Sequence, residues 1–253
     1  MKRRLAALAA AVSLLASGLA VAATTATATA AGAATRDPVV LVAGTLSPAV
    51  ILEPLAARLR ADGYTVHIFE LPNLGTTDIR ASARALNTFA DGIRARYGAS
   101  KVDLIGHSQG GLVARAYVKY EGGANEVDSL IGLGSPNYGT SIANIVAFLG
   151  LGNCIGIVAC NQMAIGSSFL NDLNAGDDTI GNVRYTNIYT SLDELVRPVE
   201  NAAMRDGATN VRVQSQCWLR VVGHLGLILD GTVYSGIQDA LAGRPVTLNC
   251  WAL

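Results

Sequence analysis

Residues 102–118, VDLIGHSQGGLVARAYV, constrain the fold more than any other stretch of the sequence. An apolar run typical of a buried strand ends at Gly106, and a pattern typical of a helix begins at Gln109. Ser108 lies between them, with a glycine two positions before it and another two positions after it. A very tight strand-to-helix turn requires small residues at those two positions, because side chains there would collide. The stretch therefore predicts a serine exposed at the end of a strand.

The rest of the chain repeats this alternation of short apolar runs and helical patterns. Strands are expected at residues 38–44, 64–71, 101–106, 127–136, 182–190 and 208–216. Helices are expected at residues 48–62, 79–97, 109–120 and 234–241. The chain of 253 residues is 51% hydrophobic, which is enough for one such domain with a substantial core. The pattern predicts one α/β domain over residues 37–253, built on a mostly parallel sheet of about six strands flanked by helices.

The first 36 residues are expected to lie outside that domain. Basic residues at positions 2–4 precede an apolar run, and the small residues at 20–22 are typical of a cleavage site. Residues 1–22 therefore predict a secretory signal peptide, and residues 23–36 an Ala/Thr-rich flexible leader. A membrane anchor is the alternative, although the apolar run is barely long enough. We expect a secreted, extracellular protein with no stable membrane span after cleavage.

Charge and cysteine content limit the partners of the chain. Removing residues 1–22 changes the formal charge from 0 (19 − 19) to −3 (16 − 19) and leaves no basic stripe. We therefore expect no nucleic-acid partner. Four cysteines in an exported chain favour two disulfides over free thiols, and of the three pairings we expect Cys154 with Cys160 and Cys217 with Cys250. Without a CxxC pair or an HExxH motif, neither a metal site nor another cofactor is expected.

A serine hydroxyl becomes a nucleophile only when a base removes its proton, and the chain has three histidines. His107 adjoins the serine, but adjacent residues at so tight a turn project apart. His67 lies within an expected strand, where a core histidine is typical. In folds with this turn the chain order is serine, acid, histidine, and only His224 follows Ser108 with strands between them. His224 is therefore the predicted base.

The acid must orient His224 and stabilise its charged form. Asp193 and Glu194 follow the expected strand at 182–190, at the carboxyl end where ligand-binding loops gather. Asp193 comes first in this loop and is the predicted acid, whereas Glu194 is predicted to begin the following helix. The remaining candidates have less suitable positions: Asp128, Asp172, Asp177, Asp178 and Asp206.

An oxyanion formed during acyl transfer needs two preorganised hydrogen-bond donors. The first predicted donor is the backbone N–H of Gln109, at the start of the helix. The second is expected from the loop after the first strand, where Thr45 or Leu46 can present an amide and Thr45 also a hydroxyl.

Residues 137–182 predict a long irregular segment with an apolar patch near residues 142–151. The segment follows the fourth strand, so it is expected on the side of the serine. It can form the wall of an acyl pocket or a mobile lid, and an ordinary buried helix is the alternative. The predicted substrate-binding residues are Leu46, Tyr138, Ile142 and Val146.

Six motifs follow one another over roughly residues 38–250: VLVAGT, GHSQGG, GLGSPNYGT, CNQMAIGSSFL, YTSLDELVRP and VVGHLGL. With these motifs in this order, the chain resembles the secreted bacterial triacylglycerol lipases of the class 2 lipase family. The chain also shares motifs with the fungal lipase B type. One departure is that the first strand ends in Ala-Gly-Thr, where many relatives have His-Gly.

The resemblance implies an α/β-hydrolase fold and hydrolysis of carboxylic esters through an acyl-enzyme. Carried onto this sequence, it implies Ser108 as nucleophile, Asp193 as acid, His224 as base, and Thr45 and Gln109 as the oxyanion hole. We expect a monomeric triacylglycerol lipase whose substrate is a lipid ester at an oil–water interface. A short-chain carboxylesterase or polyester hydrolase is the first alternative. Haloperoxidase-like or acyltransferase chemistry and a non-catalytic binding protein are more distant ones.

Overall fold

The computed structural model describes residues 36–253. The predicted signal peptide at 1–22 lies outside the described residues, as does the predicted leader except for Arg36. The described residues form one compact unit. None of its helices combines the length and the apolar character needed to cross a bilayer.

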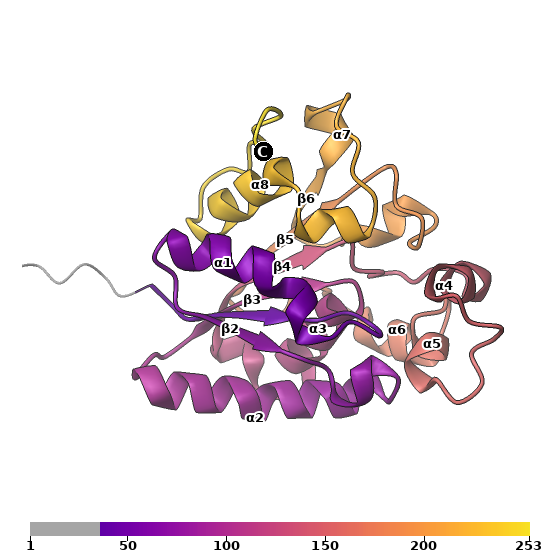
Figure 1. The fold of residues 1–253 in the computed structure, drawn as a ribbon. Coiled ribbons are helices and arrows are strands. Elements are labelled where there is room, and N and C mark those ends of the chain that lie inside the picture. The colour runs from indigo at the N-terminus through magenta and orange to yellow at the C-terminus, as the bar shows by residue number, and fades with distance from the viewer. Residues whose placement is uncertain (1–35) are drawn as a thin grey trace, which may run out of the picture. The chain divides into compact units, whose positions relative to one another are not determined.

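The centre of this unit is a sheet of six parallel strands in the order β2-β1-β3-β4-β5-β6 (Figure 1). The strands are β1 (Val39–Val42), β2 (Val66–Phe69), β3 (Val102–His107), β4 (Val127–Leu133), β5 (Arg184–Tyr189) and β6 (Thr209–Arg212). Each overlaps one of the expected strands, so the predicted parallel α/β architecture is confirmed. The last expected strand is shorter than predicted, because its second half forms helix α7 (Val213–Gln216).

The apolar runs are continuous because both faces of the sheet are covered. Val40, Val42 and Leu104 belong to one core cluster, which includes residues of α2 (Ile79–Tyr97) and α3 (Gln109–Tyr120). Alternate strand residues belong to a second cluster, which includes residues of α1 (Glu53–Ala61) and α8 (Gly231–Leu241). Figure 1 shows these two helix pairs on opposite sides of the sheet.

Local sequence signals set the ends of the helices. Asp78 caps α2 by accepting a hydrogen bond from the Arg80 N–H at 2.8 Å, and Gly98 ends the helix with a left-handed φ of 63°. The first expected helix begins later than predicted, with a 3₁₀ turn η1 (Ala49–Leu52) before α1. Pro54 has no N–H and fits an α-helix only in its first turn, so the α-helix begins at Glu53.

Residues 137–182 contain three short helices, α4 (Ile142–Leu149), α5 (Val158–Gln162) and α6 (Ser168–Leu173). They lie beyond the carboxyl ends of the strands (Figure 1). Disulfides join Cys154 to Cys160 and Cys217 to Cys250, so both predicted pairings are confirmed. The shorter elements are η2 (Pro72–Gly75), η3 (Gly123–Asn125), η4 (Val199–Ala202) and η5 (Leu225–Ile228).

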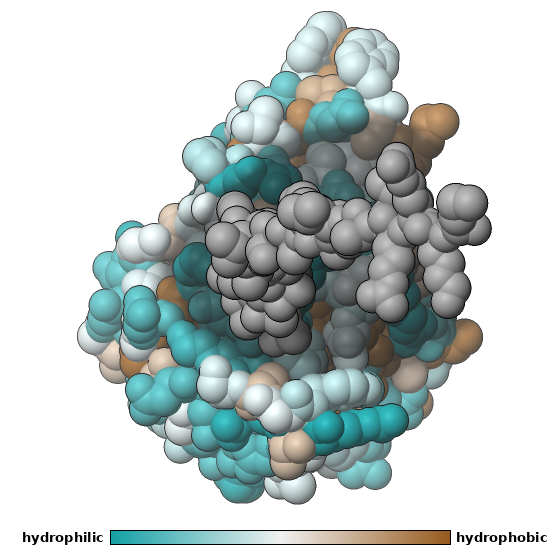
Figure 2. Space-filling model, turned by 90° about the vertical axis from the view of Figure 1, so that its left-hand side faces the viewer, coloured by the Kyte–Doolittle hydropathy of each residue, from teal (hydrophilic) through white to brown (hydrophobic). Residues whose placement is uncertain are grey.

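The strand order creates one switch point. From β1 the chain crosses to β2 on one side, and then returns to β3 on the other side of β1. The loops after β1 and β3 therefore diverge at the carboxyl edge of the sheet, which is where parallel α/β sheets bind ligands. Thr45 follows β1 and Ser108 follows β3, so the topology brings both to this point. By contrast, the side of the molecule seen in Figure 2 carries mostly hydrophilic residues among those described.

Candidate active site

Ser108 lies on the predicted turn between β3 and α3, with φ 56° and ψ −125°. A non-glycine residue in such a conformation costs on the order of 1–3 kcal/mol and persists only where its surroundings impose it. The Ser108 N–H donates to the Leu133 carbonyl at 2.9 Å, which fixes the turn against β4. The turn places Ser108 at the carboxyl edge of the sheet, as the sequence predicted, but the residue is only 5% exposed, so the predicted exposure is wrong.

The two glycines around Ser108 are required for different reasons, because each faces a different part of the backbone. A Cβ on Gly106 would lie 2.5 Å from the Gly111 nitrogen, within the turn itself. A Cβ on Gly110 would overlap the Val42 carbonyl of β1. The second glycine therefore serves the close approach of α3 to the neighbouring strand, which the motif alone did not reveal.

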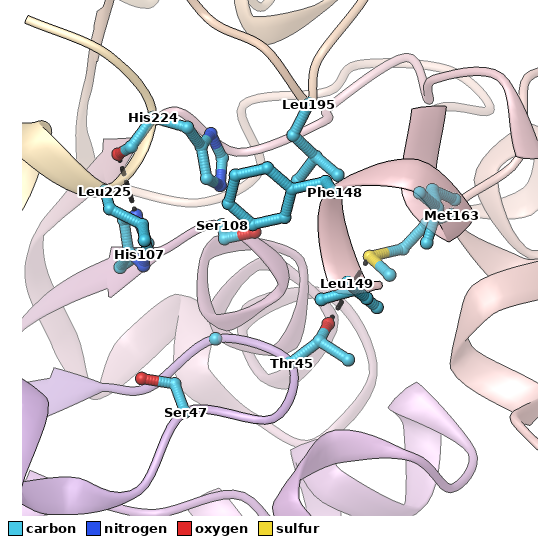
Figure 3. Close-up of a pocket in the computed structure, with 12 residues that line it drawn as sticks. Thr45, Ser47, His107, Ser108, Phe148, Leu149, Met163, Leu195, His224 and Leu225 are labelled. Atoms are coloured by element: carbon cyan, nitrogen blue, oxygen red, sulfur yellow. Dashed lines mark hydrogen bonds between the residues drawn. The ribbon is translucent and has the colours of Figure 1, made fainter. Parts of the chain in front are cut away.

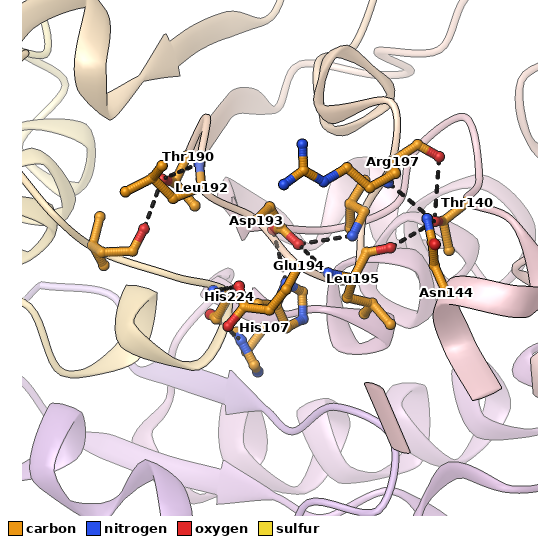
Figure 4. A network of polar contacts seen from close by, with 12 residues as sticks. His107, Thr140, Asn144, Thr190, Leu192, Asp193, Glu194, Leu195, Arg197 and His224 are labelled. Atoms are coloured by element: carbon orange, nitrogen blue, oxygen red, sulfur yellow. Dashed lines mark hydrogen bonds and ion pairs between the residues drawn. The ribbon is translucent and has the colours of Figure 1, made fainter. Parts of the chain in front are cut away.

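His224 and Asp193 form a buried pair, with 2.8 Å between His224 Nδ1 and Asp193 Oδ2 (Figure 4). Asp193 is 1% exposed, and its other oxygen accepts hydrogen bonds from the N–H groups of Leu195 at 2.9 Å and Val196 at 2.7 Å. Because a carboxylate accepts, His224 Nδ1 carries the proton in the neutral ring and Nε2 keeps its lone pair. Within residues 36–253, Nε2 makes no hydrogen bond.

The Ser108 side chain and the His224 ring line the same pocket (Figure 3). The remaining walls are mainly apolar and come from α4, from the segment after α5 and from the loops around the triad candidates: Ile145, Phe148, Leu149, Met163, Leu195 and Leu225. Phe148 meets the His224 ring edge-on, with 5.1 Å between ring centroids. The cavity has a volume of about 30 Å³, which has room for water but not for an acyl chain.

The loop after β1 supplies one side of the oxyanion site. The Thr45 hydroxyl donates to Gln109 Oε1 at 2.5 Å, so the two predicted residues are in direct contact. Leu46 is excluded as the amide donor because its N–H already donates to the Leu74 carbonyl at 2.7 Å. Since the Thr45 hydroxyl is likewise engaged with Gln109 Oε1, the Thr45 amide remains as the candidate donor from this loop, beside the Gln109 N–H at the start of α3.

The four predicted substrate-binding residues do not line this pocket. Leu46 and Ile142 are 37% and 44% exposed, and Val146 packs against the core. The Tyr138 hydroxyl donates to Asp178 Oδ2 at 2.6 Å, and its ring lies 3.9 Å from the Arg205 guanidinium carbon, at a separate polar pocket. Because almost every residue of α4 is apolar, the sequence did not reveal that Ile145, Phe148 and Leu149 form its inward face.

Two further side chains contact His224. Glu194 was predicted to begin a helix, and this is wrong, because the chain stays irregular until η4. Its Oε2 instead accepts the His224 N–H at 2.8 Å. The His107 ring, 3% exposed, lies with Nε2 3.1 Å from the His224 carbonyl oxygen. The sequence indicated neither contact, because both depend on how the loop around residue 224 folds back.

One acidic group among the described residues could share a cation, formed by Asp177, Asp178 and Asp206 with ligand atoms within 4.8 Å of one another. The Asp178 carboxylate already accepts hydrogen bonds from the Tyr138 hydroxyl and from the N–H groups of Arg205 and Asp206. None of the three acids lines the Ser108 pocket. Hydrogen bonds within the protein therefore account for the close approach of these three acids.

Comparison with known proteins gives a family. The model of the class 2 lipases matches residues 36–232. A triacylglycerol lipase from Burkholderia plantarii is 35% identical over 145 residues, which is 54% of this chain. Another, from Pseudarthrobacter phenanthrenivorans, is 35% identical over 121 residues, which is 45% of this chain. These matches span only 38% and 37% of the two relatives.

Solved structures share the fold. Aspergillus fumigatus lipase B superposes with a TM-score of 0.71 at 22% identity, over 86% of this chain and 54% of that one. The mature form of Bacillus licheniformis lipase BlEst2 superposes with a TM-score of 0.64 at 16% identity, over 82% of this chain and 93% of that one. With its parallel sheet and the serine on the turn after β3, the chain has the α/β-hydrolase fold and belongs to the class 2 lipase family.

Proposed function

We propose that the chain is a secreted serine hydrolase that cleaves carboxylic esters of lipids, acting as a triacylglycerol lipase. The single observation that carries the proposal is the buried Asp193–His224 pair in the pocket of the strained Ser108 turn. The triacylglycerol lipases that the chain resembles support the reaction class. Two disulfides support an exported protein, because such bonds persist in oxidising compartments.

The geometry supports acyl transfer in two steps. The Ser108 oxygen attacks the ester carbonyl while His224 Nε2 takes the hydroxyl proton, and Asp193 stabilises the imidazolium that forms. In this proposal the Gln109 N–H and the Thr45 amide stabilise the oxygen that gains negative charge. The ester C–O bond then breaks and His224 returns the proton to the leaving alcohol. In the second step water, deprotonated by His224, attacks the acyl-enzyme; the bond between the acyl carbon and the Ser108 oxygen breaks, His224 returns the proton to that oxygen, and the fatty acid is released.

The apolar walls of the pocket favour an acyl chain over a polar substrate. At about 30 Å³ the cavity is too small for that chain, so the side chains that α4 points inward have to move when substrate enters. A short-chain carboxylesterase is the second candidate, favoured by the same small volume. The two differ in their rates on emulsified long-chain triacylglycerols and soluble short-chain esters.

The nucleophile is tested by the change Ser108→Ala. We expect a loss of at least about 1,000-fold in kcat on any ester that the wild type hydrolyses, because an alanine side chain cannot form the acyl-enzyme. Circular dichroism and thermal unfolding provide the control for folding. Ester turnover close to that of the wild type in a folded variant would exclude the proposed mechanism.

A further inference from the structure

The main chain of His224 is held at both of its polar groups by side chains outside the Ser–Asp–His set. Its N–H donates to Glu194 Oε2 at 2.8 Å, and its carbonyl lies 3.1 Å from His107 Nε2 (Figure 4). His224 precedes η5 and lies outside every strand and α-helix of the described chain. Its carbonyl also accepts the Leu227 N–H of η5 at 3.4 Å, so one long backbone bond and the two side chains together hold it.

Glu194 approaches from the loop that also supplies Asp193. Its carboxylate packs against Gly223, where a Cβ would lie 2.7 Å from Glu194 Oε1. Consecutive residues of one loop thus hold the ring and the backbone of the same histidine, Asp193 through Nδ1 and Glu194 through the N–H. A shift of this loop would move both contacts together.

His107 approaches from the end of β3, one residue before Ser108. A carbonyl oxygen only accepts, so His107 Nε2 carries a proton and donates it to the bond with His224. Burial lowers the pKa of His107 to about 3, so the ring is neutral and Nδ1 is unprotonated under ordinary conditions. The strand that carries the nucleophile therefore also anchors the backbone of the base.

We propose that Glu194 and His107 are positioning residues that together fix the main chain of His224 and keep Nε2 aimed at the Ser108 oxygen. The proposal rests on the serine-esterase function proposed above. Neither residue is hydrogen-bonded to His224 Nε2. Each holds the backbone of His224 through one hydrogen bond, and the His107 ring also packs against the His224 ring, with 4.9 Å between ring centroids.

Two substitutions distinguish the hydrogen bond that Glu194 accepts from the effect of its negative charge. Glu194→Ala removes the acceptor, and we expect kcat to fall by about 10- to 100-fold with KM within about twofold, because displacement of the base affects only the chemical step. Glu194→Gln keeps an amide oxygen that can accept the same N–H, so we expect it to recover most of the wild-type kcat. Glu121→Ala, at the C-terminal end of α3 and outside the pocket lining, is the matched control and should leave kcat unchanged.

The bond itself is measured by hydrogen exchange of the His224 amide, followed by NMR. We expect protection in the wild type and in Glu194→Gln, and faster exchange in Glu194→Ala. His107→Phe keeps an aromatic ring but lacks the donor, and we expect about a tenfold lower kcat at unchanged KM. Thermal unfolding of each variant shows whether it is folded, and the exposed position of Glu194 keeps its variants informative.

Two results would overturn the proposal. One is a folded Glu194→Ala variant with wild-type kcat, and the other is Glu194→Gln as impaired as Glu194→Ala, which would assign the effect to charge. A wild-type protein that hydrolyses no ester would instead overturn the proposed function. In that case unchanged amide exchange in Glu194→Ala would still reject the backbone contact, so the two failures are distinguishable.

Discussion

Asp193 and Glu194 are adjacent carboxylates that contact the same histidine in different ways. Asp193 is buried, binds the His224 ring and has its second oxygen satisfied by two backbone N–H groups. Glu194 is exposed and binds only the His224 backbone. The difference in burial supports the proposed roles, because a buried carboxylate stabilises an imidazolium more strongly than a solvated one.

The change Asp193→Asn tests that assignment. An amide at this position can donate to His224 Nδ1 and so favours the tautomer with a proton on Nε2, which cannot act as a base. We expect kcat to fall by about 10,000-fold with the fold retained. Esterase rates of Asp193→Asn and Glu194→Gln, measured side by side, provide the comparison. A larger loss in Glu194→Gln would reverse the two roles.

At the scale of secondary-structure elements, α4 determines access to Ser108. Ile145, Phe148 and Leu149 form its inward face, at the spacing of three and four residues that one side of a helix presents. The disulfide between Cys154 and Cys160 ties the chain shortly after this helix. The chain that follows α4 is therefore joined covalently to α5, which contains Cys160.

Phe148→Ala should change chain-length preference. Removing the ring that lies against His224 enlarges the cavity next to Ser108. We expect kcat/KM for long-chain esters to rise roughly tenfold relative to short-chain esters. Rates across a series of acyl lengths give the measurement, and Ile142→Ala, on the exposed face of α4, is the control. An equal shift in both variants would contradict the assigned inward face.

The elements differ in how far their sequence predicts them. Strands such as β1 and β3 are predictable because burial on both faces demands a continuous apolar run. The Ser108 turn is predictable because only small residues fit around it. Which face of α4 points inward is not predictable, since its residues are nearly all apolar and only tertiary contacts select that face. The role of Glu194 is hidden for a different reason, because its partner is a peptide group 30 positions away.

At the scale of the whole molecule, the two edges of the sheet have opposite chemistry. The carboxyl edge holds the pocket, whereas the amino edge carries a cluster of charged residues around Asp103 at the start of β3. Asp103 is 5% exposed, and burial together with the charges of Asp128 and Asp37 raises its pKa to about 8. The folded protein therefore holds a proton there that the unfolded chain releases near the ordinary carboxyl pKa of 3.8.

The sign of the resulting pH dependence follows from proton binding. Since the folded state binds the Asp103 proton more tightly, this group lowers the free energy of unfolding as pH rises from about 4 to about 8. His107 acts oppositely below its ordinary pKa of 6.5, because its folded pKa is about 3 and the unfolded chain is protonated first. The two effects oppose each other between pH 4 and 6.5, and only that of Asp103 remains above this range.

Asp103→Asn should remove the loss of stability at alkaline pH. We expect the variant to gain stability over the wild type between pH 6.5 and pH 8.5, because an amide has no proton to release. Urea unfolding at several pH values gives the two stability curves, and Asp172→Asn, on the exposed surface of α6, is the control. Parallel curves for wild type and Asp103→Asn would show that Asp103 is ionised in the folded state.

The hydrogen bond from His107 to the His224 carbonyl means that β3 supports two groups of the pocket, Ser108 and the backbone of His224. His107 and Ser108 are consecutive residues, so any thermal displacement of the end of β3 carries the proposed nucleophile and the anchor of the proposed base in the same direction. Relative motion between the two reacting groups is then smaller than the motion of either within the domain. The apolar walls of the pocket come from α4, Met163, Leu195 and Leu225 and not from β3, so we expect heating to change the shape of the pocket before it changes the alignment of the two groups.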